Sequence, residues 1–290
     1  ILAGLLRFVG IYPGHDAYHA DEPIVYGSAV EMILNNTLDP GRYDYPPVSM
    51  YINYLAFKMF FIPLSWGKFY LERFQQVLDG LVQINMSPLE ARRTFHTFII
   101  GSRGIYAMYW GRYTTALFSL GSVFLVYILG RNMFNKKVGL IAAFLLAFNF
   151  RHVLNSHITL PDIYNAFFLL LSVITLDKLR KNPDKLNYLL SGLILGVYFS
   201  TKYQIFPLVT LGTIYLMTGF KNIKSLIISG ATFLLTIFIL NPYFFIKYEE
   251  ALRWISSVSS KYGFGVFKLN LYPLSYEFHY DWGPVISILF

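Results

Sequence analysis

Cysteine is absent from the 290-residue sequence, which excludes disulfide bonds and any zinc site built on thiolates. Charged residues are also scarce, at 14% against about 25% in an ordinary soluble domain. The hydrophobic share is 55%, the aromatic share is 19% and the mean hydropathy is +0.47. Together these values predict an all-α membrane protein built as a polytopic bundle of transmembrane helices.

Both ends of the sequence lie inside apolar segments, which predicts a fragment of a longer chain. The first residues read "ILAGLLRFVGIY" and the last read "VISILF". We expect residues 1–11 to be part of a first membrane span and residues 284–290 to begin another. The whole sequence is then the N-terminal part of one transmembrane domain, without internal repeats.

Between these ends the sequence contains further runs that are long and apolar enough to suggest membrane spans. A helix needs roughly 20 apolar residues to cross the hydrocarbon core, and charges near the ends of a span are tolerated at modest cost. We therefore predict six spans within residues 112–246. Their uncharged parts are residues 113–130, 138–150, 163–176, 186–201, 203–220 and 225–246.

Alternate connectors between these runs are strongly basic. They read "RNMFNKK", "DKLRKNPDK" and "KNIK", and they hold nine Lys or Arg residues but only two acids. Such connectors face the cytoplasm in plasma or cytoplasmic membranes. The net charge of +8 therefore predicts orientation in a bilayer, and not a nucleic-acid partner. By parity, residues 12–111 and 247–283 form loops on the extracytoplasmic side.

One apolar segment does not fit this parity as a span. Residues 46–66 read "PPVSMYINYLAFKMFFIPLSW", and a single crossing there would invert the orientation. We predict a helix lying in the outer interface, with Lys58 at the depth of the lipid headgroups. The alternative is a true crossing paired with a second one near residues 95–110.

The first external loop opens with acids and histidines. "DEPIVYGSAVEMILNN" predicts an amphipathic helix that begins at Asp21 and Glu22. Asp21 alone could simply cap this helix, since Asp is a preferred capping residue. A helix N-terminus also favours an ionised carboxylate, which suits a general base.

Other polar side chains fall on the same predicted side. For Lys202 the alternative to ligand binding is simple snorkelling, and Arg151 and Asp162 could form a structural ion pair. His15, His19 and Asp21 are weak candidates for a divalent cation, although their spacing matches no specific zinc pattern. The remaining polar candidates of this side are Asp44, Tyr45, Arg112 and His157.

The order of these parts resembles the GT-C superfamily of membrane glycosyltransferases. An Asp-Glu pair follows the first span, and a "YPP" turn comes after that pair. Arg112 then opens a span that ends in "LGRNMF". "RHVLNSHITLPDIYNAFF", "STKY" and "NPYFF" complete the set. The closest resemblance is to the glycosyltransferase 39-like branch of protein O-mannosyltransferases and lipid A aminoarabinose transferases, and it extends over nearly all of the sequence.

This resemblance implies transfer of a sugar from a polyprenyl-phosphate-linked donor to a hydroxyl of a protein, lipid or glycan, with inversion at the anomeric carbon. Asp21 matches the catalytic aspartate and is expected to be the general base. Ile24 and Tyr45 stand where the aminoarabinose transferases have cations. The expected roles of the other residues are catalytic support by Glu22 and Asp162, binding of the donor phosphate by Lys202, Arg151 and Tyr45, and support of the acceptor by His19, Asp44, His157 and Arg112.

Two other functions compete with transfer. A transporter or flippase of lipid-linked substrates would place its polar site near the bilayer midplane, in broken and repeated helices. A non-catalytic membrane scaffold would not explain why Asp21, Asp162 and Lys202 gather on one side. Whether Asp21 and Asp162 open into one outer cavity discriminates between these interpretations: a shared cavity favours the enzyme, and positions on opposite flanks argue against it.

Overall fold

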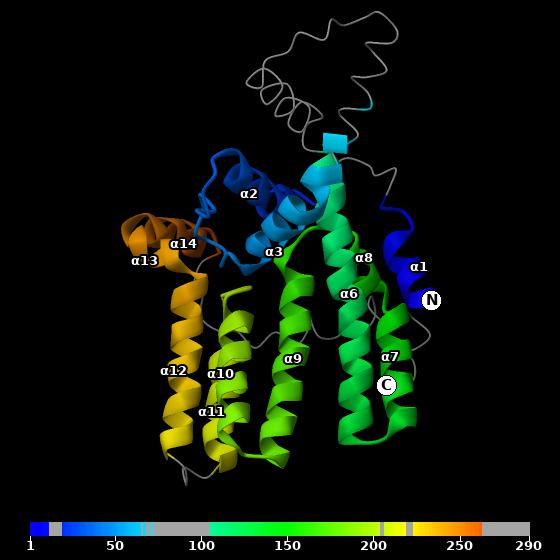
Figure 1. Cartoon of the computed structure of the whole chain (residues 1–290), viewed down its shortest axis with the longest axis vertical. Helices are drawn as coiled ribbons and strands as arrows, with labels where there is room; N and C mark the ends of the chain where they lie inside the picture. Colours follow the sequence, from blue (N-terminus) through cyan, green and yellow to red (C-terminus); the bar gives the residue numbers. More distant parts are fainter. Residues whose placement is uncertain are drawn as a thin grey trace, which may run out of the picture.

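The computed structural model describes residues 1–11, 19–64, 66–67, 71, 105–203, 206–218 and 223–262 (Figure 1). All secondary structure in these ranges is helical, which confirms the predicted all-α class. Every apolar run predicted as a span overlaps one of the long helices. The bundle helices are α1 (Leu2–Phe8), α6 (Ile105–Met133), α7 (Lys136–Phe148), α8 (Phe150–Ser156), α9 (Pro161–Lys181), α10 (Lys185–Phe199), α11 (Phe206–Thr218) and α12 (Ile223–Leu240).

Two of these helices are long and apolar enough to cross a membrane, namely α6, over Ala107–Met133, and α12. A third crossing is available if α7 and α8, which meet at an angle of 61°, act as one broken span. Asn149 lies at the bend, where its side-chain oxygen accepts a hydrogen bond from the backbone N–H of His152 at 2.8 Å. The chain is thus a helical membrane bundle, and the number of six spans stays a prediction.

The two ends of the bundle differ in charge and in covering (Figure 1). One end carries the first two basic connectors, between α6 and α7 and between α9 and α10. There Lys181 Nζ donates a hydrogen bond to the carbonyl of Asn132 at 3.0 Å. The opposite end carries helices that lie across the bundle axis. These are α2 (Glu22–Leu34), α3 (Val48–Ala56) with its π-helical extension Phe57–Phe61, α13 (Pro242–Ile246) and α14 (Tyr248–Tyr262).

The arrangement of α3 agrees with the interfacial position predicted for residues 46–66. Helix α3 packs mainly on α2 and also contacts α6, at the end of the bundle away from the basic connectors. The buried cluster between α2, α3 and α6 includes Ala29, Met32, Met50 and Phe57. An external, interfacial location is a statement about a membrane and therefore remains a prediction.

A buried arginine ties α1 to the bundle. All five N–H groups of Arg7 are used by acceptors on α1, α6, α7 and α8, so its charge is fully solvated by the protein. Two of the acceptors are carbonyls of the last turn of α7, where the helix dipole favours a cation. The acceptors are Ser119 Oγ, the carbonyls of Ala3, Leu146 and Ala147, and His152 Nδ1.

Helices α10 and α12 pack closely because α10 presents glycines to α12. A Cβ atom added at Gly192 would overlap the backbone carbonyl of Ser229 and the hydroxyl of Thr232. One added at Gly196 would overlap Thr236 in the same way. Small residues let the two backbones approach and gain dispersion contacts, which drive helix association in a bilayer.

Gly192→Ala is expected to destabilise the protein by about 1–3 kcal/mol, because the backbone of α12 must shift to admit the methyl group. Chemical unfolding of the detergent-solubilised protein measures this. Gly212→Ala in α11 is the matched control: its Cβ would meet nothing within 4 Å, and Ala is the better helix former. Equal stability of the two variants would contradict the close α10–α12 contact.

Candidate active site

The end of the bundle that carries α2 is organised by a buried ion pair. Arg112 Nε donates to Glu22 Oε1 at 2.6 Å, and Arg112 Nη2 donates to Glu22 Oε2 at 2.8 Å. Neither side chain is exposed to solvent. Glu22 Oε1 also accepts a hydrogen bond from the backbone N–H of Thr159 at 3.2 Å. Glu22 therefore joins α2, α6 and the segment before α9, and its carboxylate is engaged by the protein.

Asp21 precedes this pair and has the opposite environment. Its side chain is 50% exposed, and although it occupies the N-cap position of α2, it makes no capping hydrogen bond. The alternative that Asp21 merely caps the helix is thus not supported. The backbone N–H of Asp21 donates to His19 Nδ1 at 3.1 Å, and the same ring nitrogen lies 3.9 Å from Asp21 Oδ2.

Lys202 and Asp162 are brought together at the same end. Lys202 Nζ donates to Asp162 Oδ1 at 2.8 Å, and the two side chains are 36% and 47% exposed. Asp162 lies in the first turn of α9, three residues after Thr159, which hydrogen-bonds Glu22. An exposed pair of this kind contributes only about 0–1 kcal/mol, so a stronger anion can displace Asp162 from Lys202.

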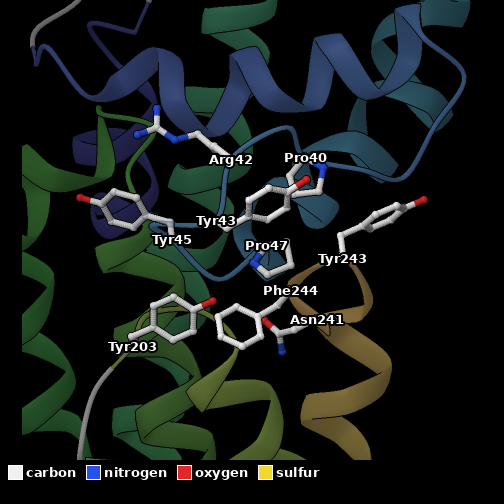
Figure 2. A pocket seen from close by; sticks show the side chains of 9 residues that line it. All are labelled: Pro40, Arg42, Tyr43, Tyr45, Pro47, Tyr203, Asn241, Tyr243 and Phe244. Atoms are coloured by element: carbon white, nitrogen blue, oxygen red, sulfur yellow. The ribbon is translucent and has the colours of Figure 1, made fainter. Parts of the chain in front are cut away.

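Beside these residues lies a narrow pocket rich in tyrosine, the tyrosine pocket (Figure 2). Its volume of about 10 Å³ is roughly the minimum for one water molecule. Three parts of the chain form it: the loop before α3, Tyr203 after α10, and the junction of α12 with α13. The lining residues are Pro40, Arg42, Tyr43, Tyr45, Pro47, Tyr203, Asn241, Tyr243 and Phe244.

An apolar groove continues from this pocket. It has a volume of about 380 Å³, and Tyr203, Asn241 and Phe244 belong to both hollows. The other lining residues come from α10, α11, α12, α13 and α14, namely Phe199, Leu208, Phe233, Leu234, Ile237, Phe245 and Ile255. A pocket lined by tyrosines, an arginine and an asparagine that opens into an apolar groove suits an amphipathic ligand with a polar head and a hydrocarbon tail.

The loop before α3 is fastened across the tyrosine pocket to α13 and α14. Lys247 Nζ lies 2.6 Å from Asp39 Oδ2, while Asp39 Oδ1 accepts hydrogen bonds from the hydroxyl of Tyr43 at 2.8 Å and from the backbone N–H of Gly41 at 3.0 Å. Gly41 has a φ of +69°, which favours glycine in this turn. We call Asp39 and Lys247 the clasp.

A second contact supports the clasp. Arg42 holds Asp44 through both carboxylate oxygens, with Nε to Oδ1 at 2.8 Å, and its guanidinium lies 5.3 Å from the ring centre of Trp254 on α14. The pKa of Arg42 is raised, first by its hydrogen bond to Asp44 and also by the charge of Asp21. Asp44 is thus held by Arg42 within the loop, and Asp21 is close enough to Arg42 for its charge to raise the pKa of the guanidinium group.

The clasp shifts the pKa values of its two groups in opposite directions. Burial alone would raise the pKa of Asp39, but hydrogen bonds from Lys247, Gly41 and Tyr43 hold it below its ordinary value of 3.8. The hydrogen bond to Asp39 raises the pKa of Lys247 above its ordinary value of 10.5. Both ionised forms are therefore favoured near neutral pH.

Among the sequence-predicted site residues that the structure describes, Tyr45 lines the tyrosine pocket, whereas the others, including Asp21, Asp162 and Lys202, line neither hollow. Two of them belong to α8 and the turn after it. Arg151 is on α8, which packs on α1, α6, α7 and α9, and it lines neither hollow. His157 joins α8 to α1, with Nδ1 2.9 Å from the carbonyl of Val153 and Nε2 3.0 Å from that of Val9. The structure does not bring these two to the tyrosine pocket, and their predicted roles in binding stay untested.

The predicted metal candidates are only partly within the structure. His15 lies outside the described residues, and His19 and Asp21 are described without a third ligand nearby. Within the described ranges no group of three or more His, Asp or Glu side chains is arranged to hold a metal ion. A divalent cation at this site therefore stays an open expectation.

Sequence reasoning missed Asp39, Arg42, Tyr203, Asn241 and Lys247. Three of these had a visible signal, since Arg42 stands two residues from Asp44, Tyr203 follows Lys202, and Asn241 opens the "NPYFF" motif. Nothing in the sequence links Asp39 to Lys247, because their contact depends on how two distant loops fold together.

Comparison with known proteins gave one match. The family model described as dolichyl-phosphate-mannose-protein mannosyltransferase matches residues 95–244, just over half of the chain. Neither a curated protein nor a solved structure is matched by the chain. The matched part includes Arg112, Asp162, Lys202 and Asn241, whereas Asp21 precedes it.

Glu22→Gln is expected to lower the free energy of unfolding by about 3–5 kcal/mol, because it removes the opposite charge with which the buried Arg112 pairs. Thermal unfolding in detergent measures the loss. Replacing both residues with methionine is the control and should recover much of the stability. An unchanged unfolding temperature of Glu22→Gln would contradict the structural role of the pair.

The clasp predicts a window in the pH dependence of stability. Because folding lowers the pKa of Asp39, its ionised carboxylate stabilises the folded state above pH 3.8, and this stabilisation is lost as the pH falls below that value. Because folding raises the pKa of Lys247, its ammonium group stabilises the folded state below pH 10.5, and this stabilisation is lost as the pH rises above that value. Wild type should therefore exceed Asp39→Asn by about 1 kcal/mol at most between these limits, and the two should converge outside them. Unfolding curves at several pH values, with Glu31→Gln as control, test this.

Proposed function

We propose that this chain, which belongs to the dolichyl-phosphate-mannose-protein mannosyltransferase family, transfers a sugar from a polyprenyl-phosphate-linked donor to an acceptor hydroxyl, with inversion and with Asp21 as general base. Membership makes it a membrane glycosyltransferase that uses a lipid-linked sugar donor. The observation that carries the finer proposal is the position of Asp21. Its carboxylate is uncapped and half exposed, at the bundle end that also holds the two hollows.

The two hollows support a lipid-linked donor. An isoprenoid tail is purely apolar and fits the groove, whose lining is almost entirely hydrocarbon and aromatic. The phosphate and the sugar would then lie towards the tyrosine pocket, where hydroxyl and amide groups are available. Holding the tail in this way fixes the reacting bond near one end of the bundle and lowers the entropic barrier to transfer.

In the proposed reaction, Asp21 takes the proton of the acceptor hydroxyl as its oxygen attacks the anomeric carbon. The bond from that carbon to the phosphate oxygen breaks, and polyprenyl phosphate leaves with the electron pair. Proton acceptance by a positioned carboxylate commonly contributes about 10²–10⁴-fold in rate. Attack opposite to the leaving phosphate inverts the configuration of the sugar.

Lys202 is assigned to the departing phosphate. Its exposed pair with Asp162 is weak enough to exchange for a phosphate, and the ammonium group then stabilises the growing charge. Glu22 is assigned a positioning role, because its buried pair with Arg112 fixes the start of α2 and therefore the location of Asp21. The acceptor that best fits the family is a protein hydroxyl.

The reaction is assigned to the extracytoplasmic face. The supporting observation is that the connectors α6–α7 and α9–α10 and the helices α2, α3, α13 and α14 lie at opposite ends of the bundle. Basic connectors face the cytoplasm by the positive-inside rule, which leaves Asp21 and both hollows outside. A lipid-linked donor presents its sugar at that depth.

Asp21→Asn is expected to lower transfer at least 10²-fold while the protein stays folded, because the amide cannot accept the proton. The measurement is transfer of labelled mannose from polyprenyl phosphate mannose to a threonine-containing peptide in liposomes, with and without a chelator. Glu31→Gln, which removes another exposed carboxylate of α2, should leave the rate unchanged. Substantial turnover by Asp21→Asn would remove Asp21 from the role of base.

A further inference from the structure

Asn241 stands at the junction of α12 and α13, and its amide nitrogen is fully used there. Nδ2 donates to Ser200 Oγ at 2.8 Å and to the carbonyl of Ile237 at 2.8 Å. A carbonyl can only accept, so the contact with Ile237 fixes which end of the amide is the nitrogen. The side chain thereby ties the end of α12 to the end of α10, and its oxygen points elsewhere.

Within the part of the chain that the structure describes, that oxygen has no partner. Asn241 is 3% exposed, and its Oδ1 is a buried acceptor without a hydrogen bond there. A buried acceptor left unpaired lowers stability, and such groups are rare enough that each one indicates a missing partner or a functional cost. The missing partner must be a donor, either a water molecule or a ligand.

The position of Asn241 distinguishes it from other orphan groups. It lines both the tyrosine pocket and the apolar groove, as do Tyr203 and Phe244. Figure 2 shows these three side chains together at one end of the pocket. A ligand with its tail in the groove and its head in the pocket would lie against these three shared residues.

We propose that Asn241 Oδ1 accepts a hydrogen bond from a substrate hydroxyl and so recognises the sugar, or the acceptor, at the junction of the two hollows. An oxygen that can only accept repels the oxygens of a phosphate, which carry no proton, and selects an O–H group. The assignment rests on the proposed function, and it makes Asn241 a determinant of which head group is accepted.

Binding to two lipids isolates this hydroxyl contact. The quantity to measure is the preference of the full chain, purified in detergent, for polyprenyl phosphate mannose over bare polyprenyl phosphate, as a ratio of Kd values. Asn241→Leu keeps the branched arrangement of side-chain heavy atoms but removes the acceptor, and it is expected to lower this preference about five- to tenfold. The affinity for bare polyprenyl phosphate should stay within twofold of wild type.

Asn53→Leu is the matched control. Asn53 is also fully buried with an unpaired Oδ1, and its Nδ2 also makes two hydrogen bonds, to the carbonyl of Ser49 at 2.8 Å and to the hydroxyl of Tyr164 at 3.0 Å. It lines neither the tyrosine pocket nor the groove. Both leucine variants therefore lose equivalent amide bonds, and only Asn241→Leu should change the lipid preference.

Asn241→Asp keeps an acceptor oxygen and serves if the leucine variant does not fold. Its added charge weakens binding of both lipids, but the preference for the sugar-bearing lipid should stay near that of wild type. A preference lost in Asn241→Asp, or retained in Asn241→Leu, argues against recognition of a sugar hydroxyl.

A transfer assay with the threonine-containing peptide shows whether the hydroxyl belongs to the sugar or to the acceptor. If Asn241→Leu leaves the lipid preference intact but raises the KM for the threonine-containing peptide about five- to tenfold, the hydroxyl belongs to the acceptor and the proposal holds. If the lipid preference and the KM for the peptide in Asn241→Leu both match those of Asn53→Leu, Asn241 holds only a buried water and the proposal is overturned. Failure of wild type to bind either lipid would instead contradict the proposed function.

Discussion

The buried pair of Glu22 and Arg112 sets the geometry on which the candidate site depends. Two charges without solvent exposure are tolerated only when they satisfy each other, so α2 can start at only one place on α6. The backbone N–H of Thr159 adds the segment before α9 to the same joint. Asp21, one residue earlier, is thereby held at a fixed point with its carboxylate directed to solvent.

The opposite wall of the site comes from parts of the chain that are far apart in the sequence. The clasp and the contact of Arg42 with Trp254 draw the loop before α3 onto α13 and α14. The tyrosine pocket lies between the loop before α3, Tyr203 and the junction of α12 with α13, and its volume is small because these parts are tightly joined. A donor head group larger than a water molecule therefore requires the loop before α3 to move away from α13, and the clasp, in which Lys247 is 44% exposed and Asp39 13% exposed, opposes this movement.

Apolar runs and basic connectors were enough to predict the helices and the end of the bundle at which the polar groups gather, because both signals depend on local composition. The sequence alone does not predict that one side chain of the Asp-Glu pair is buried and the other exposed. Which of Asp21 and Glu22 is buried depends on a partner 90 residues away along the chain. The "NPYFF" motif was visible, but the unpaired oxygen of Asn241 appears only once α10 and α12 are packed.

Hydrogen-bond satisfaction distinguishes Arg7 from Asp21 and Asn241. Arg7 is buried and charged, yet all five of its N–H groups have acceptors, so it can stabilise the bundle but has nothing to offer a substrate. Asp21 and Asn241 differ, since the side-chain oxygen of Asn241 accepts no hydrogen bond from the part of the chain that the structure describes, and the side chain of Asp21 accepts none from the start of α2. Asp21 is exposed and Asn241 is buried, and this difference fits their assignments. A general base must be reached by an incoming hydroxyl from solvent. A recognition group discriminates better where water cannot replace the ligand as a hydrogen-bond partner.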